Sequence, residues 1–207
     1  MNFECKNIIY VLTATNRDKI NKLLPLLSQK RQNLKNIAGS LGELLIRIVA
    51  CENLKTENNT LVFAEKENHK PFLKNYPQFH FNMSHCENIV TVAFSDDFVG
   101  VDIEKIRPVN LKIAERFFSS EEKLLVKDNL SFFTLWTKKE AFIKRSGNGL
   151  KTPLNSFNVL KENNIKTFIE DNIIISLCSN NPESFRLLWL DENDVLNAAS
   201  KLNINKI

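Results

Sequence analysis

Two acidic residues stand two positions apart in a run that has the pattern of a strand. In this run the apolar residues Val99, Val101 and Ile103 alternate with smaller or polar ones, Asp102 and Glu104 among them, which is typical of a strand with one apolar face. The two carboxylates therefore project from the other face, about 6 to 7 Å apart along the backbone, close enough to share one hard cation. Taken alone, the pair favours the plainer interpretation of a solvated strand face, because exposed acidic residues need no explanation.

A carboxylate and an ammonium stand one helical turn apart later in the chain. Glu140 and Lys144 share a helix face with Trp136 and Ile143. In isolation this spacing favours an ion pair on a helix surface, worth about 0.2 to 0.5 kcal/mol. If Glu140 instead joins the two strand carboxylates, the three acids form an oxygen-rich site of the kind that Mg²⁺ takes together with substrate phosphates and water.

Scarce residue types exclude several other kinds of site. The three histidines, His69, His80 and His85, form no H-E-x-x-H pair, so a zinc hydrolase site of that design is excluded and any metal must rest on carboxylates. The five glycines form neither G-x-x-x-x-G-K-[ST] nor G-x-G-x-x-G, which rules out a P-loop and a Rossmann turn. By itself, His85 is more typical of a loop residue bonded to backbone than of a catalyst.

The composition is that of an ordinary globular protein. The 207 residues carry 28 Lys and Arg against 24 Asp and Glu, a net charge of +4, and 43% are hydrophobic, which suffices for a sizeable core in one or two domains. So small a net charge argues against a dedicated nucleic-acid-binding module. The scattered cysteines form no C-x-x-C pair, and we find neither a signal peptide nor an apolar run of about 18 residues. We therefore expect a cytoplasmic protein with reduced thiols.

The elements that must position these residues follow from periodicity and turn residues. Ser40 and Glu43 have the spacing of a capping box and open an amphipathic helix. Ser95 to Asp97 is predicted to be a hairpin turn, and Gly147 the C-terminal cap of a helix. The predicted strands are 8–15, 79–83, 89–94, 98–104, 157–160, 173–178 and 185–190, and the predicted helical stretches are 17–24, 40–49, 111–127 and 132–146. Local hairpins mixed with helices argue for an α+β fold.

Four motifs occur together in an order that resembles a known family. They are Phe81-Asn82-Met83-Ser84-His85, then Gly100-Val101-Asp102-Ile103-Glu104, then Arg116-Phe117-Phe118 with Glu122, then Trp136-x-x-Lys139-Glu140-Ala141-x-x-Lys144-x-x-Gly147-x-Gly149-Leu150. Together they closely resemble the 4′-phosphopantetheinyl transferases, and specifically their long, surfactin-synthetase-activating branch. The resemblance spans essentially the whole chain and is strongest from Lys70 to Phe157.

The resemblance implies a fold, a reaction and partners. The fold would consist of two similar α/β halves related by a pseudo-twofold, with residues 1–97 on the nucleotide side and residues 98–207 carrying the metal-binding and transfer motifs. Coenzyme A would bind in the cleft between them. The enzyme would move the phosphopantetheine arm of coenzyme A to a serine of an apo acyl or peptidyl carrier protein and release adenosine 3′,5′-bisphosphate. Because one chain supplies both walls of the cleft, the enzyme would act as a monomer.

The resemblance also implies which residues carry out the transfer. Asp102, Glu104 and Glu140 would hold Mg²⁺, which bridges the diphosphate of coenzyme A, and Asp102 would also contact coenzyme A itself. Glu140 has a second candidate role, because it could take the proton of the incoming serine directly or through water. Lys144 would bind the phosphates of coenzyme A and stabilise their developing charge.

Further residues are implied on the nucleotide side. His85 would contact the 3′-phosphate, with Lys70 and Lys30 as further phosphate ligands. Glu122 would either support the metal site or cap a helix.

The chain departs from the family pattern at several of these positions. Cys86 stands where the family has a hydroxyl residue, and His69 stands where it has glycine before Lys-Pro. The Arg-Ser/Thr pair that touches the nucleotide falls on Ala38-Gly39, and one basic phosphate ligand falls on Asn33. These changes spare the metal site and the transferred phosphate, but they predict a raised KM for coenzyme A.

The carrier partner and two rival functions follow from the same residues. Carrier proteins are acidic around their modified serine, so we expect docking on a mildly basic segment that added salt would weaken. A metal-dependent nuclease would also combine acids with a lysine, but its lysine would stand two residues from a metal-binding acid on the strand. The other rival is a family member that has lost activity. The docking segment comprises Lys105, Arg107, Lys112 and Arg116, with Phe117 and Phe118 nearby.

Overall fold

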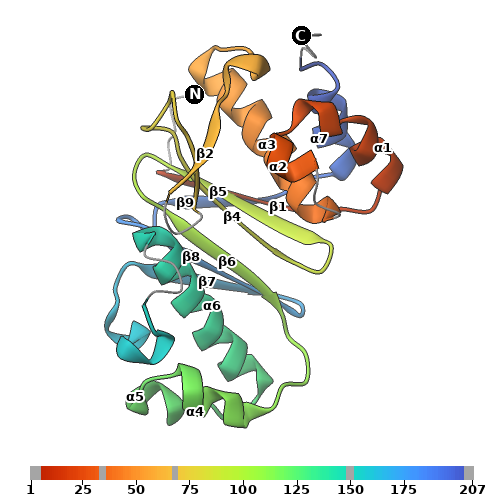
Figure 1. Cartoon of the computed structure of the whole chain (residues 1–207). Helices are drawn as coiled ribbons and strands as arrows, with labels where there is room; N and C mark the ends of the chain where they lie inside the picture. Colours follow the sequence, from red (N-terminus) through yellow and green to blue (C-terminus); the bar gives the residue numbers. More distant parts are fainter. Residues whose placement is uncertain (1–5, 33–35, 67–69, 148–151, 203–207) are drawn as a thin grey trace.

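The computed structural model describes residues 6–32, 36–66, 70–147 and 152–202 (Figure 1). Asn33, His69, Gly149 and Leu150, which figured in the sequence motifs and departures, lie outside these ranges. The strands are β1 (Asn7–Thr13), β2 (Phe63–Glu65), β3 (Pro71–Leu73), β4 (His80–Cys86), β5 (Ile89–Ser95), β6 (Gly100–Lys105), β7 (Ile165–Glu170), β8 (Ile173–Cys178) and β9 (Phe185–Trp189). The α-helices are α1 (Arg17–Lys22), α2 (Gln29–Gln32), α3 (Ile37–Leu54), α4 (Ala114–Phe117), α5 (Ser120–Lys123), α6 (Asn129–Ser146) and α7 (Glu192–Ala199).

Two sheets pack face to face between two helical layers, which confirms the predicted α+β class (Figure 1). One sheet has the strand order β4-β5-β1-β9 and the other has the order β6-β8-β7, while β2 and β3 form a separate pair. Alternation along the strands gives each sheet two apolar faces: on β1, Leu12 packs toward α3, whereas Ile9 and Val11 pack toward Val101 and Ile175 of the second sheet. The outer face of the second sheet is covered by α6.

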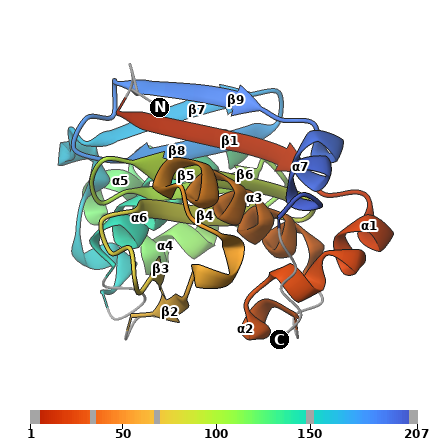
Figure 2. The same ribbon diagram turned by 90° about the horizontal axis from the view of Figure 1, so that it is seen from above.

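The last strand and helix return to the first sheet. Strand β9 pairs in parallel with β1, with Asn7 opposite Phe185 and Val11 opposite Trp189, and Figure 2 shows the two strands side by side. Helix α7 then packs against α3. The sheet that begins the chain is therefore completed by residues from its far end, and the division at residue 97 stays a prediction.

The N-cap of helix α3 lies four residues before Ser40, the predicted start of the capping box. Its N-cap is Asn36, whose side chain accepts a hydrogen bond from the backbone N–H of Gly39. The Ser40 hydroxyl donates to the carbonyl of Asn36, and the Glu43 carboxylate is bound by Arg47. The predicted box was wrong because both of its side chains bind other groups.

Three other local predictions were wrong. The hairpin turn lies at Glu87 and Asn88, between β4 and β5, with Glu87 at a φ of 54°, whereas 95–97 crosses from one sheet to the other. Residues 157–160 form no strand and end in a 3-10 turn, Val159–Lys161, while β7 went unpredicted. The helical stretch 111–127 is broken into a 3-10 turn and the short helices α4 and α5.

Within the described ranges, no helix is both long and apolar enough to cross a membrane.

Candidate functional site

Asp102 lies at the junction of three elements. Its carboxylate Oδ1 is 2.6 Å from Lys144 Nζ of α6 and accepts a hydrogen bond of 2.7 Å from the Ser84 hydroxyl of β4. Lys144 Nζ also donates to Ser84 Oγ over 2.8 Å. The predicted face of β6 is thus covered by α6, and Ser84 of β4 reaches Asp102, so Asp102 is buried and not solvated. Ser84 was missed as a functional residue, although it stood in the motif with His85.

Gly100 lets α6 approach β6 this closely. A Cβ atom at Gly100 would lie 2.0 Å from the carbonyl oxygen of Ala141 and 2.4 Å from the amide nitrogen of Arg145. Since both atoms are backbone, any larger residue would push the helix away. The glycine therefore sets the distance at which Lys144 meets Asp102.

Only one oxygen of the Asp102 carboxylate is hydrogen-bonded by the residues that the structure describes. Oδ2 is buried and, among the described residues, has no hydrogen-bond donor. Burial raises the pKa of Asp102, the charge and hydrogen bonds of Lys144 and the Ser84 hydroxyl lower it, and the charge of Glu104 raises it again. A buried carboxylate oxygen with no donor is costly in water-excluded surroundings, and it fits a hard cation as its missing partner.

Glu140 belongs to the same electrostatic cluster, whereas Glu104 is partly committed elsewhere. Burial raises the pKa of Glu140, and the negative charges of Asp102 and Glu104 raise it further, while Lys144 lowers it. Glu104 Oε2, however, is 2.8 Å from Arg107 and accepts from the Cys86 thiol over 3.4 Å. Across the described ranges, no three His, Cys, Asp or Glu side chains gather in a form that could hold a metal ion. The three predicted ligands therefore influence one another electrostatically, but they do not surround a common point as metal ligands would.

His85 lies at the end of β4 beside the start of α3. The Asn36 amide donates to His85 Nε2 over 3.0 Å, since the oxygen of that amide already accepts from Gly39 N. Burial lowers the pKa of His85, and the positive charges of Arg31 and Lys144 lower it further, against a raising effect of Asp102. His85 is therefore held as a neutral imidazole whose Nε2 carries no proton.

The two predicted phosphate-binding lysines do not meet His85. Lys30 is 63% exposed and forms an ion pair with Glu65. Lys70 Nζ donates to the carbonyls of Val99 and Lys144 over 2.9 and 2.5 Å, and burial lowers its pKa to about 8. The ammonium thus ties the end of α6 to the start of β6.

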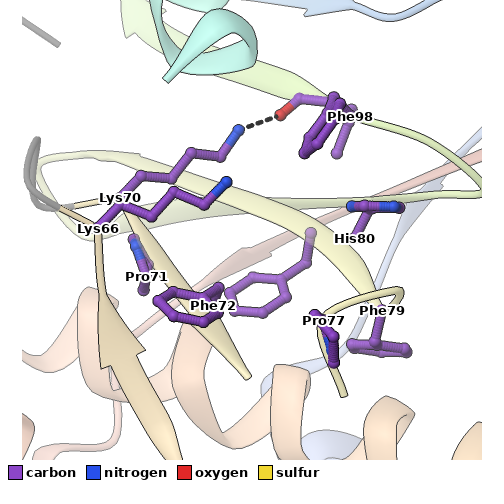
Figure 3. Close-up of a pocket in the computed structure, with 10 residues that line it drawn as sticks. Lys66, Lys70, Pro71, Phe72, Pro77, Phe79, His80 and Phe98 are labelled. Atoms are coloured by element: carbon purple, nitrogen blue, oxygen red, sulfur yellow. Dashed lines mark hydrogen bonds between the residues drawn. The ribbon is translucent and has the colours of Figure 1, made fainter. Parts of the chain in front are cut away.

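A pocket of about 220 Å³ opens next to Lys70 (Figure 3). Its walls are mainly aromatic, with Phe72, His80 and Phe98 around the space, and Lys66 lies 5.1 Å from the centre of the Phe98 ring.

A fully buried ion pair holds the elements behind the site. Lys139 Nζ is 2.7 Å from Glu122 Oε2, and neither side chain is exposed. Lys139 also donates to the carbonyls of Leu154 and Phe157, and Glu122 accepts from the backbone N–H groups of Ser119 and Val159. Of the two roles open for Glu122, the structure shows the helix cap, in a capping box with Ser119.

The predicted docking segment is only partly available to a partner. Lys105 and Arg107 pair with Glu87 and Glu104 over 2.8 Å each. Phe118 is 1% exposed and lies in the core, so its predicted part in docking was wrong. Lys112 and Arg116 are exposed, and exposed apolar side chains lie just before α4 and just after α5: Ile113, Leu124 and Leu125.

Comparison with known proteins covers both sheets. A family model described as 4′-phosphopantetheinyl transferase superfamily matches residues 98–194, and one described as 4′-phosphopantetheinyl transferase, N-terminal, matches residues 5–97. The 4′-phosphopantetheinyl transferase ffp of Bacillus subtilis is 38% identical over 165 residues, which is 73% of this chain and 74% of that protein. The 4′-phosphopantetheinyl transferase gsp of Aneurinibacillus migulanus is 34% identical over 182 residues, covering 84% and 76%. The 4′-phosphopantetheinyl transferase Sfp of Bacillus subtilis strain 168 is 42% identical over 125 residues, covering 58% and 56%.

These matches confirm the resemblance carried by the motifs, and the cluster of Asp102, Lys144 and Ser84 lies where three of those motifs meet. The chain therefore belongs to the 4′-phosphopantetheinyl transferase superfamily, in its Sfp-type branch, and is an enzyme that transfers the phosphopantetheine arm of coenzyme A to carrier proteins.

Proposed function

We propose that this transferase holds Mg²⁺ with Asp102, Glu104 and Glu140 while it moves the phosphopantetheine arm of coenzyme A to the serine of an apo carrier protein. The observation that carries the metal assignment is the buried Oδ2 of Asp102, which has no donor among the described residues. Glu140 lies close enough to Asp102 for the negative charge of Asp102 to raise the pKa of Glu140. When bound, the cation supplies charge neutralisation at the diphosphate.

The protein side chains then divide the work of the transfer. Glu140, whose pKa is raised above that of an ordinary glutamate mainly by burial, accepts the serine proton, directly or through water. Lys144 is 28% exposed, so its ammonium is fixed by Asp102 yet open to an anionic phosphate, which it stabilises as the phosphoanhydride bond breaks. The Ser84 hydroxyl holds Lys144 and Asp102 in place, because it accepts a hydrogen bond from Lys144 and donates one to Asp102.

Mass spectrometry of the product tests this function directly. We expect the protein, mixed with coenzyme A, Mg²⁺ and a panel of apo acyl and peptidyl carrier proteins, to add one phosphopantetheine arm to at least one carrier. A chelator should stop the reaction, and added Mg²⁺ should restore it. An absence of mass gain with every carrier would leave an inactive family member, and cleavage of DNA in the same buffer would favour the nuclease instead.

We place carrier docking on Lys112 and Arg116 together with the apolar side chains of Ile113, Leu124 and Leu125. Lys112 and Arg116 are exposed, whereas Lys105 and Arg107 are paired with acids. Two exposed cations steer an acidic partner, and the apolar side chains provide contact area once it arrives. Leu124 is 70% exposed and Leu125 is 50% exposed, so both side chains offer apolar surface to a partner.

Salt dependence tests this docking surface. In Lys112→Glu/Arg116→Glu, we expect kcat/KM for the carrier to fall about tenfold at low salt, because reversed charges oppose steering. The difference from the wild type should shrink as salt rises, since the Debye length is about 10 Å at 0.1 M. The matched charge reversal Arg186→Glu, at an exposed position of β9, should leave kcat/KM unchanged. Equal salt dependence in wild type and double variant would contradict the assignment.

We also propose that the enzyme acts as a cytoplasmic monomer. Ser84 comes from the first sheet and Asp102 from the second, so one chain brings both walls to the site. The described cysteines Cys51, Cys86 and Cys178 are free thiols, which suits a reducing compartment.

A further inference from the structure

Arg31 of α2 packs against bare backbone at the start of α3. A Cβ atom at position 39 would lie 2.2 Å from one terminal nitrogen of the guanidinium and 3.0 Å from its central carbon. No substitution at Gly39 is therefore possible without displacing Arg31. The side chain is only 19% exposed, so its direction is fixed by packing. Gly39 is one of the departures from the family pattern, and the Arg31 guanidinium occupies the space that a side chain at position 39 would fill.

The terminal nitrogens of Arg31 have no hydrogen-bond acceptor among the described residues. Within the described ranges its ion-pair contact is from Nε to Glu43 Oε2 over 3.8 Å, which is beyond hydrogen-bond range. Glu43 is already bound by the Arg47 guanidinium and by the amide and hydroxyl of Ser28. A guanidinium that is mostly buried and has no acceptor in the described part of the chain is well suited to bind an anion through two nitrogens at once.

Arg31 also lies within electrostatic reach of His85. After burial, the charge of Arg31 is the largest influence that lowers the pKa of His85, and Lys144 acts in the same direction. The neighbouring Lys30 points away to Glu65. Of the two basic residues in this segment, Arg31 therefore faces the site.

We infer that Arg31 is the guanidinium that binds the phosphate monoester of coenzyme A beside His85, and that Gly39 is required because it leaves room for Arg31. This role rests on the proposed function, since it concerns the same coenzyme A. A phosphate monoester is doubly charged and can present two of its oxygens to a guanidinium fork, so it matches the two terminal nitrogens of Arg31. The departure at Ala38-Gly39 then costs little affinity, because Arg31 supplies the missing donor from another helix.

Calorimetry with two ligands separates this role from a general loss of binding. We expect wild type to bind coenzyme A at least tenfold more tightly than dephospho-coenzyme A, which lacks the 3′-phosphate. Arg31→Ala should weaken the binding of coenzyme A about 10- to 100-fold, the range of a charge-assisted hydrogen bond pair. The affinity for dephospho-coenzyme A should stay within twofold of the wild-type value. The matched control Arg186→Ala should change neither value.

A double-mutant cycle tests the dependence on Gly39. Gly39→Ala should weaken the binding of coenzyme A when Arg31 is present. In Arg31→Ala it should have no further effect, because the guanidinium that a Cβ atom at position 39 displaces is already absent. The pKa of His85, followed by NMR, should rise in Arg31→Ala as a positive neighbour is removed. Equal weakening of both ligands, additive effects of the two substitutions, or no loss in Arg31→Ala would overturn the inference. If Arg31→Ala weakens only coenzyme A but no carrier gains mass, the proposed function is wrong while the phosphate-binding role of Arg31 is supported.

Discussion

Asp102→Asn is expected to lower kcat for phosphopantetheine transfer about 10²- to 10³-fold, the scale of a lost electrostatic contact to the transition state. Asparagine keeps the shape and one oxygen for Ser84 and Lys144. It removes the negative charge from the buried Oδ2 position, where no described residue donates, and with that charge the proposed hold on the cation. The measurement is the initial rate with coenzyme A and an apo carrier across a range of Mg²⁺ concentrations.

The control for this substitution is its effect on folding. Asp102 is buried, but its partner Lys144 is 28% exposed, so the ammonium left by Asp102→Asn keeps contact with water and the melting temperature should stay close to that of wild type. The exposed, helix-opening Asp18 offers a matched Asp→Asn change that should affect neither rate nor stability. Transfer at the wild-type rate in Asp102→Asn would refute the assigned mechanism, whereas a large drop in melting temperature would point to a structural role.

Lys139→Met is expected to destabilise the protein by about 3 to 5 kcal/mol, because it leaves the Glu122 carboxylate buried and unpaired. Both side chains are 0% exposed, so water does not compensate for the lost ammonium. Lys139 also binds the carbonyls of Leu154 and Phe157, and these lose their donor at the same time. Denaturant unfolding of the full chain measures the effect.

A second ion pair in the same region serves as the control. Lys161 and Glu121 are as close, at 2.8 Å, but both are more than half exposed, so Lys161→Met should leave the unfolding midpoint unchanged. The double variant Lys139→Met/Glu122→Gln should lose no more free energy of unfolding than Lys139→Met alone, since the two side chains act as a unit. Similar costs for Lys139→Met and Lys161→Met would show that burial of the pair contributes nothing.

Periodicity predicted the parts of the site that depend on local sequence. The alternation through Val101 and Ile103 correctly placed both acids on one face of β6, and the turn of helix between Glu140 and Lys144 correctly placed them on one face of α6. Whether that face meets water depends on how the sheets stack, which no local pattern specifies. Ser84 was missed for the same reason, because its partners lie 18 and 60 residues away.

Other errors arose where tertiary contacts override local preference. The apolar segment 157–160 has strand-forming residues, yet Lys139 binds the Phe157 carbonyl and Glu122 binds the Val159 amide. Those bonds use the backbone groups that a strand would need. Lys30 and Arg31 are adjacent and alike in charge, and only packing at Gly39 distinguishes the one that faces His85.

The return of β9 to the first sheet has a consequence for how the polypeptide acquires its shape. Strand β1 lies between β5 and β9, with partners about 80 and 180 residues away along the chain. During synthesis, β1 can pair with β5 early, but its other side keeps an open edge of amides and carbonyls until residues 185–189 emerge. Because long-range pairing of this kind slows folding, that edge is the place where a partly made chain is most exposed to association with its copies.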